Sequence, residues 1–182
     1  MISHVAQDGE MQARGSFERV PLRVLCLGND LMADDSLGHV VAEQLCQVLP
    51  AEVELVDSPA AGFHLLDYVL GVRRLIVIDT IITGGAPPGT IRVFDDCRMK
   101  TMETISPHYV GLFETLALAR SLSLEVAEEV EILAVEAADC STVGGAMHPA
   151  VRAAIPSLIR MVRQRAAMEA DRPLKQIARS TA

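Results

Sequence analysis

The chain has 182 residues, half of them apolar, with no tryptophan and a formal net charge of −8. This length suits one well-packed domain, and a core filled mainly by Ala, Val, Leu and Ile suits buried parallel strands covered by helices. The acidic balance argues against a nucleic-acid partner, because phosphate contacts need clustered Lys and Arg.

The cysteines and the apolar runs indicate the cellular compartment in which the protein works. The four cysteines, at positions 26, 46, 97 and 140, are too far apart for a zinc knuckle or a redox pair. The longest purely aliphatic run, residues 75–78, is far shorter than a membrane span, and the polar first residues lack the apolar core of a signal peptide. We therefore expect a cytoplasmic protein without disulfides or a membrane span.

In chain order, residues 1–20 are predicted to be a flexible leader. The unbroken apolar run 23–27 predicts a strand buried on both faces, and a loop over 28–35 follows it. A helix from residue 37 then ends before Pro50, with Ser36 or Asp35 as its N-cap. Further strands are expected at 53–56, 72–78, 90–94 and 130–135, and further helices at 63–69, from Pro107, and at 148–167.

The last of these helices contains Pro156, where we expect a kink or a new helix start. Strands alternate with helices along the chain, which predicts one doubly wound α/β domain over 21–167, with helices on both faces of the sheet. Residues 168–182 are predicted to be a flexible basic tail, for which a solvated surface is the simplest interpretation.

Three acids follow the ends of three predicted strands: Asp35, Asp57 and Asp79. Ligands of open α/β sheets bind at the carboxyl ends of strands, where the strand order reverses, so we expect these carboxylates at one rim. His108 stands in the first turn of a later helix, whose positive end favours a neutral imidazole that can bind a metal. Carboxylates and imidazole together suit zinc or nickel. Each residue alone is more commonly a helix cap or a loop hydrogen bonder, so the functional interpretation depends on their convergence.

Other catalytic signatures are missing from the sequence. It contains no GxGxxG, no GxxxxGK[ST] and no Gly-x-Ser-x-Gly elbow. Ser58 or Ser106 would act as a nucleophile only with a base beside it, and nothing in the spacing requires one.

Five motifs, in the same order along the chain, resemble those of the hydrogenase maturation endopeptidases, the processing proteases of NiFe hydrogenases. The resemblance covers residues 22–165. Its motifs are 28–38 (GNDLMADDSLG), 57–66, 76–80 (IVIDT), 88–91 (PGTI), and 106–108 (SPH) followed by Gly111 and Leu112.

The resemblance implies a three-layer α/β/α sandwich of the phosphorylase/hydrolase-like kind. Its five-stranded, mostly parallel sheet would have the strand order 2-1-3-5-4, with strand 4 antiparallel. The implied activity is one cut, which removes the C-terminal extension of the hydrogenase large-subunit precursor after nickel insertion. The implied partner is that precursor, and this protein is expected to act on it as a monomer.

The resemblance also implies the site. Asp35, Asp79 and His108 would bind the nickel carried by the precursor, while Asp34 holds the loop. Asp57 and Asp35 would be the catalytic residues, and Asp57, Gly28 and Asn29 would bind substrate. Whether the isolated protein holds a divalent metal at rest is left open. Two departures stand out, since many members have Glu at the position of Asp35 and a Gly-rich loop at the position of 58–61.

Alternatives remain for the mechanism and for the function. The metal could polarise the carbonyl or activate water, or, in an aspartyl-type mechanism, Asp57 could act as general base. The same ligands would also serve a non-catalytic metal-sensing checkpoint or chaperone for the precursor. Another hydrolase on the same scaffold is a third possibility. Peptidyl-tRNA hydrolases also have a strand ending in Leu-Gly-Asn, but no basic RNA-binding surface accompanies it here.

Overall fold

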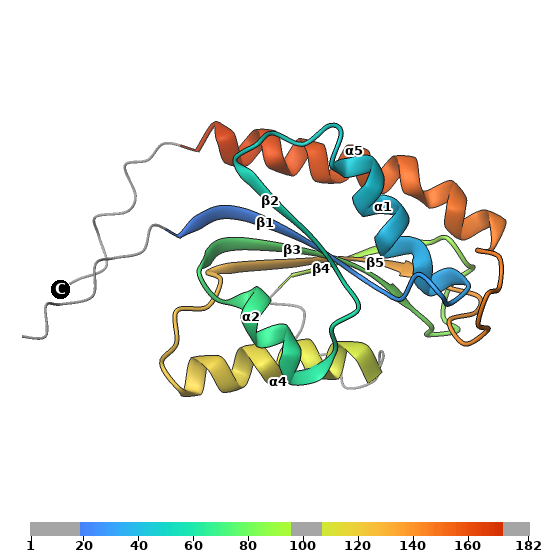
Figure 1. Ribbon diagram of the computed structural model, residues 1–182, viewed down its shortest axis with the longest axis horizontal. Coiled ribbons are helices and arrows are strands. Elements are labelled where there is room, and N and C mark those ends of the chain that lie inside the picture. The colour runs from blue at the N-terminus through green and yellow to red at the C-terminus, as the bar shows by residue number, and fades with distance from the viewer. Residues whose placement is uncertain (1–18, 96–106, 173–182) are drawn as a thin grey trace, which may run out of the picture.

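The computed structural model of the protein describes residues 19–95 and 107–172, with the side chains of residues 107–111 and 113 excepted. The predicted leader up to residue 18 and the tail from residue 173 lie outside the described residues. Within them, one sheet forms a middle layer between two layers of helices (Figure 1).

The sheet has the expected strand order β2-β1-β3-β5-β4, in which β4 runs antiparallel to β5 and the other pairs are parallel. The fold prediction is therefore confirmed. The strands are β1 (Val20–Leu27), β2 (Val53–Ser58), β3 (Val72–Ile81), β4 (Ile91–Asp95) and β5 (Glu129–Glu136).

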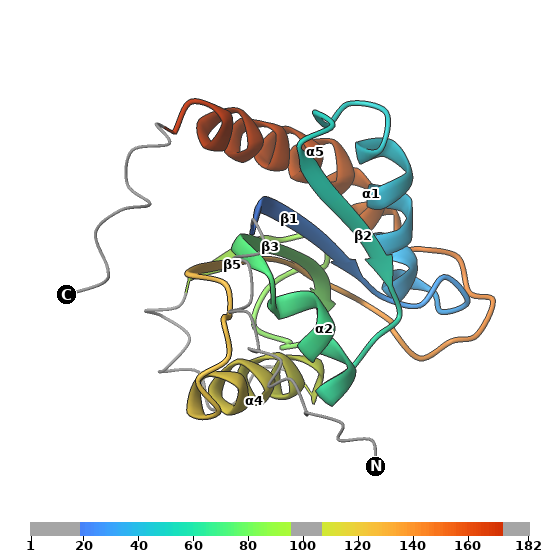
Figure 2. The ribbon, with the colours of Figure 1, turned by 60° about the vertical axis from the view of Figure 1, so that its left-hand side comes forward.

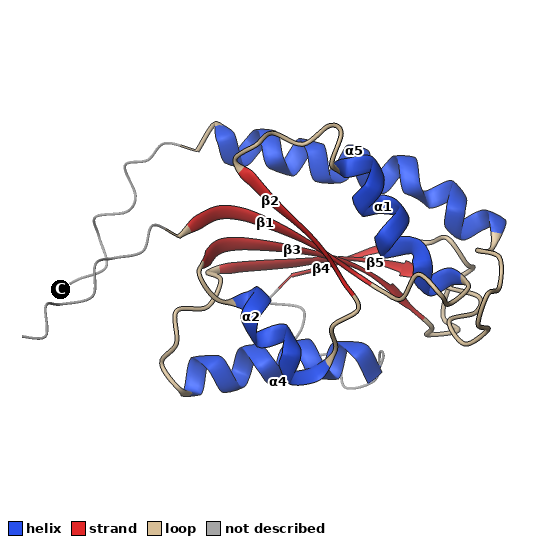
Figure 3. Ribbon diagram, viewed as in Figure 1, coloured by secondary structure: helices blue, strands red, loops and turns tan. Residues whose placement is uncertain are grey.

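Helices cover both faces of the sheet (Figure 3). On one face lie α1 (Leu37–Leu45) and α5 (Pro149–Ala170), and on the other lie α2 (Leu66–Val69) and α4 (Pro107–Ser121). A 3-10 turn, η2 (Gly62–Leu65), leads into α2, and another, η1 (Asp34–Ser36), leads into α1. Figure 2 shows β1 in the interior of the sheet, between β2 and β3.

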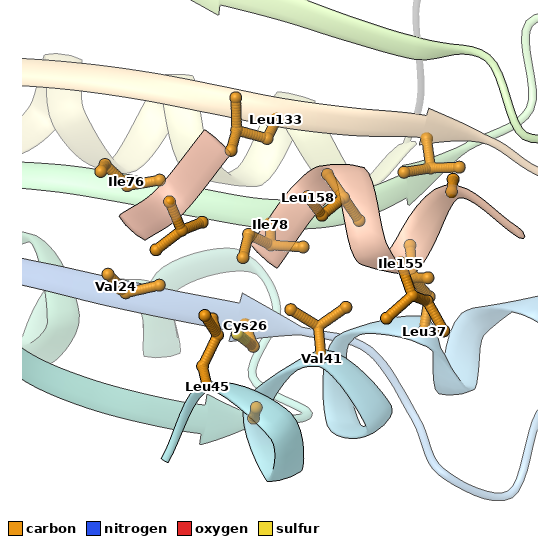
Figure 4. Close-up of a cluster of buried hydrophobic side chains, with 14 of the residues drawn as sticks. Val24, Cys26, Leu37, Val41, Leu45, Ile76, Ile78, Leu133, Ile155 and Leu158 are labelled. Atoms are coloured by element: carbon orange, nitrogen blue, oxygen red, sulfur yellow. The ribbon is translucent and has the colours of Figure 1, made fainter. Parts of the chain in front are cut away.

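Each helical layer closes a separate apolar core against the sheet. Between the sheet and α1 and α5, strand residues such as Val24 and Ile78 meet Val41, Leu45 and Leu158 (Figure 4). A second core lies under α2 and α4. Fully burying each Val, Leu or Ile contributes roughly 1.5–3 kcal/mol, so these two cores supply most of the drive to fold.

The strands β2 and β3 are longer than the sequence-based prediction. Asp57 pairs with Cys26 within the β1–β2 ladder, and Asp79 lies within β3, which runs on to Ile81 opposite Glu136. The prediction that these two acids lie beyond the strand ends is therefore wrong. Both strands continue because their neighbours still offer ladder hydrogen bonds, which satisfy the backbone around a polar residue.

The predicted cap of the first helix is also wrong. In the described part of the chain, neither Ser36 nor Asp35 makes a side-chain cap at the start of α1. The Ser36 hydroxyl instead donates to the Ala33 carbonyl at 2.7 Å, and Asp35 accepts from the loop, as described below.

The helix α5 runs as one element through Pro156, so a new helix start there is not observed. Burial of its neighbours Ile155 and Leu158 against the sheet offsets the loss of one amide donor. The helix extends past residue 167 to Ala170, and Arg172 of the predicted basic tail is paired with Glu129.

Among the helices of the described ranges, none combines the length and the hydropathy that crossing a bilayer would need.

Two glycines allow the loop after β1 to close tightly. A Cβ atom on Gly38 would lie 2.1 Å from the Leu27 carbonyl oxygen, and one on Gly28, whose φ is +146°, would lie 2.1 Å from the Asp35 carbonyl oxygen. The first turn of α1 therefore rests directly on the end of β1, with no room for a side chain between them.

We predict that Gly38→Ala lowers the free energy of unfolding by about 2–4 kcal/mol, because backbone atoms must shift to admit the new methyl group. Urea unfolding followed by circular dichroism measures this. Gly85→Ala is the control, since its Cβ would meet only the end of the Arg92 side chain, at 3.3 Å, and the Thr83 hydroxyl, at 3.4 Å. Equal stability losses in the two variants would contradict the close-contact argument.

Candidate functional site

A cavity of about 250 Å³ opens at the carboxyl ends of the parallel strands. The chain passes from β1 to β2 on one side of β1, and β3 lies on its other side, so the strand order reverses at β1. Open α/β sheets bind their ligands at such a reversal. The lining residues of the cavity come from four parts of the chain, beginning with the last residue of β1. They are Leu27, Gly28, Asn29, Met32 and Asp35 after β1, Pro59, Ala60, Ala61 and Leu65 after β2, Asp79 in β3, and Cys140 after β5.

Asp35 is held at the wall of this cavity by one donor on each carboxylate oxygen. The backbone N–H of Asn29 donates to Oδ2 at 3.0 Å, and the Thr80 hydroxyl donates to Oδ1 at 2.9 Å. Each oxygen keeps a further lone pair. Asp35 is thus oriented by the protein while it can still accept from, or coordinate, a group in the cavity.

Asp79 is the most deeply buried acid of the cavity, with 4% of its surface exposed. The backbone N–H of Thr80 donates to its Oδ1 at 2.7 Å, and no partner for Oδ2 is found among the described residues. Burial raises the pKa of Asp79 to about 8, and the neighbouring Asp35 charge adds to the rise, against the lowering effect of the Thr80 N–H. At neutral pH, Asp79 is therefore mostly protonated.

Asp34, next to Asp35, has a structural role. It is fully buried, and its carboxylate accepts from the backbone N–H groups of Ala138, Asp139 and His148 at 2.6–2.9 Å. These bonds tie the loop after β1 to the connection between β5 and α5. The prediction that Asp34 holds the loop is confirmed.

Asp57 lies apart from the cavity. The ladder places it level with Cys26 of β1 and Ile78 of β3, so its side chain points to the α1 face, while Asp79, one residue beyond Ile78, points to the opposite face. Its carboxylate contacts the His39 Nδ1 at 2.6 Å. That contact raises the pKa of His39, which also lies 3.6 Å from Glu43. The expected convergence thus unites Asp35 and Asp79 but not Asp57.

The side chain of His108 lies outside the described residues, so its predicted part in the metal site is a prediction still. The backbone at this position forms the first turn of α4. Further along this helix, the Thr115 hydroxyl donates to the Gly62 carbonyl at 3.1 Å, which fastens α4 beside the segment that follows β2. Within the described side chains, no group of three or more His, Cys, Asp or Glu is close enough to hold a metal ion.

Cys140 and Thr80 are parts of the site that the sequence reasoning missed. The Cys140 thiol donates to the Thr80 hydroxyl at 3.5 Å, and burial raises its pKa to about 11, so it is a neutral thiol. The available signal was position, because Cys140 follows the end of a strand, as Asp35 does. Among the described side chains, the Ser58 hydroxyl has no base as a hydrogen-bond partner, because it donates to the Tyr68 hydroxyl and accepts from the Ala60 N–H, each at 3.1 Å.

Comparison with known proteins gives a consistent result. The family model described as hydrogenase maturation protease, HycI, matches residues 39–165. The hydrogenase 2 maturation protease of Escherichia coli is 36% identical over 101 residues, covering 53% of this chain and 62% of that protein. The hydrogenase expression/formation protein HupD of Thiocapsa roseopersicina is 33% identical over 143 residues, covering 76% and 64%.

The chain thus spans a little under two thirds of the length of these two relatives. Among solved structures, the hydrogenase maturating endopeptidase HybD from E. coli superimposes with a TM-score of 0.71 at 28% identity, covering 81% of this chain and 92% of that one. The matched family region makes up more than half of the chain and contains Asp79 and Cys140 of the site described above. The chain therefore belongs to the hydrogenase maturation protease family.

Proposed function

We propose that this protein is an endopeptidase that removes the C-terminal extension of a NiFe hydrogenase large-subunit precursor after nickel has been inserted. The observation that supports this most directly is the cavity at the strand ends, where two carboxylates from separate elements meet in a member of the maturation protease family. Both acids keep oxygen lone pairs available, which an incoming substrate can use.

In this proposal, the metal enters as cargo on the substrate. Asp35 and Asp79 offer carboxylate oxygens, and His108 offers an imidazole from the first turn of α4, a donor set that suits nickel or zinc. Contact with the inserted nickel would place the neighbouring peptide bond at the cavity, so that positioning supplies much of the rate. A precursor without nickel would lack this anchor and would be left uncut.

Cleavage then needs a base for the attacking water. Asp35 is the better placed candidate, because it lies at the cavity and its carboxylate is oriented by Asn29 and Thr80. Asp57 is engaged with His39 on the other face of the sheet, so we assign it to substrate contact along the edge strand β2. Gly28 and Asn29, which line the cavity, would meet the backbone of the substrate.

We predict that Asp35→Asn and Asp79→Asn each lower the cleavage rate of nickel-loaded precursor at least about 100-fold, since each removes a metal ligand or base. The mass loss of the precursor, followed by mass spectrometry with purified components, measures this. Asp30→Asn is the matched control, because this residue lies in the same loop but is exposed and outside the cavity lining.

The same cleavage assay separates a substrate-binding role of Asp57 from a catalytic one, and an endopeptidase from a checkpoint. Asp57→Asn should raise KM more than it lowers kcat if Asp57 contacts substrate only. If the wild-type protein forms a stable complex with nickel-loaded precursor and does not cleave it, its function is that of a non-catalytic checkpoint and not of an endopeptidase. Full activity in both cavity variants would overturn the assignment of the site.

His108→Ala should impair the processing of nickel-loaded precursor, because the proposed imidazole ligand that anchors the nickel is lost. Processing can be followed in cells by the mobility of the large subunit on denaturing gels, in medium with and without added nickel. His64→Ala, which changes an exposed histidine outside the cavity lining, is the control. Unimpaired processing in His108→Ala would contradict a role in metal sensing.

The raised pKa of Asp79 gives a prediction about stability. Between the ordinary carboxyl pKa of 3.8 and about 8, the native state keeps a proton that the unfolded chain releases. The contribution of Asp79 to stability therefore falls as the pH rises through this window. Asp79→Asn removes the titration, so its advantage over wild type should grow from near zero at pH 4 to on the order of 2–4 kcal/mol at pH 9.

Urea unfolding at pH 4, 6.5 and 9, in the presence of a chelator, measures this advantage. Asp30→Asn again serves as the control and should follow the wild-type curve. A difference between Asp79→Asn and wild type that stays constant with pH would show that Asp79 is ionised throughout.

A further inference from the structure

We propose that Thr80 is a positioning residue that sets the relative geometry of the two cavity carboxylates, and so controls how the site grips the metal-bearing substrate. This inference rests on the proposed function and deepens it, by naming a residue that would act through the carboxylates.

Thr80 contacts both acids at once. Its backbone N–H donates to the Asp79 Oδ1 at 2.7 Å, and its hydroxyl donates to the Asp35 Oδ1 at 2.9 Å. Asp79 and Asp35 come from different elements, β3 and the loop after β1. One residue, itself 3% exposed, therefore couples the position of the loop acid to that of the strand acid.

The direction of these bonds is fixed by chemistry. The Thr80 hydroxyl donates its proton to the Asp35 Oδ1, which accepts it. The lone pairs of the same oxygen then face Cys140, whose thiol donates to it at 3.5 Å. The thiol thus favours the orientation in which the Thr80 hydroxyl donates to Asp35. A chain of hydrogen bonds runs from Cys140 through Thr80 to Asp35.

The consequence is a fixed carboxylate plane at Asp35. Thr80 holds one oxygen and the Asn29 N–H holds the other at 3.0 Å, so rotation about the last side-chain bond would break a hydrogen bond in either direction. No hydrogen bond joins Asp35 directly to Asp79 in the described part of the chain, whereas Thr80 donates to one oxygen of each acid. This arrangement suits a cation that takes one oxygen from each acid.

The same contacts explain how Asp35 can bind a metal at a position where many family members have the longer Glu. Asp has one methylene fewer than Glu and reaches less far into a cavity, so its approach depends more on where its backbone is held. The hydroxyl of Thr80 fastens Asp35 against the end of β3. Partners of metal ligands of this kind typically contribute roughly 10–100-fold to metal affinity or to activity.

Thr80→Val tests the inference, because valine keeps the branched shape and the backbone N–H to Asp79 but loses the hydroxyl. We expect Ni²⁺ binding, measured by isothermal titration calorimetry, and kcat on nickel-loaded precursor to fall about 10-fold or more, with KM changing less than kcat. Thr80→Ser restores the hydroxyl and should recover both to within about 3-fold of wild type.

Thr83→Val is the matched control. Its hydroxyl also donates to a buried carboxylate, that of Glu136, at 2.7–2.9 Å, but this acid is not part of the cavity lining. It should lose stability as Thr80→Val does and keep Ni²⁺ affinity and kcat within about 3-fold of wild type. If Thr80→Val proves unfolded by circular dichroism, Thr80→Ala is the second hydroxyl-free variant, with the same expected losses.

The outcomes separate this inference from the proposed function. A wild-type protein that cleaves, together with a folded Thr80→Val variant that binds Ni²⁺ and cleaves equally well, overturns the positioning role and leaves the function standing. Equal losses in Thr83→Val, or no rescue by Thr80→Ser, also overturn it, because the effect would then be general destabilisation. A wild-type protein that never cleaves nickel-loaded precursor overturns the function, and this inference with it.

Discussion

The register of β1 between its two neighbours is the constraint on which the site depends. Cys26 pairs with Asp57 on one side and with Ile78 on the other, and successive residues of a strand point to opposite faces. Asp79 therefore faces the cavity, while Asp57 faces α1. A slip of one residue in either ladder would exchange these faces and bury the apolar residues on the wrong sides, so the two cores that stabilise the sheet also place the acids.

The order of elements and the position of the site follow from the sequence more readily than its detail does. Apolar runs interrupted by Gly28 and Asp79 locate the strands and their rim, and the motif resemblance supplied the strand order. The strand ends were not predictable in the same way, because Asp57 and Thr80 look like loop residues and are kept in the sheet by neighbouring strands. The pairing of Asp57 with His39 depends on the packing of α1 across β2, which no local pattern reveals.

Two neighbouring aspartates illustrate how position divides labour. Asp34 is enclosed by three backbone donors and fastens the connection before α5, whereas Asp35 keeps lone pairs for the cavity. Gly28 and Gly38 bring the start of α1 against the end of β1, and within this tight turn Asp34 bonds the connection after β5 while Asp35 bonds Asn29 and Thr80. Asp34 stabilises the loop, and the stable loop holds Asp35 at the wall of the cavity.

Asp79 stands out when the described buried carboxylates are compared. Glu136 accepts from the Thr83 hydroxyl and from the backbone of Thr83 and Gly84, and Glu169 is paired with arginines such as Arg73. Each of these is satisfied, as buried charges in a stable fold usually are. Asp79 receives one backbone donor, and burial raises its pKa to about 8. A group held so far from its preferred state weakens the folded protein, and a buried acid of this kind at a cavity wall is the physical reason to place the function here.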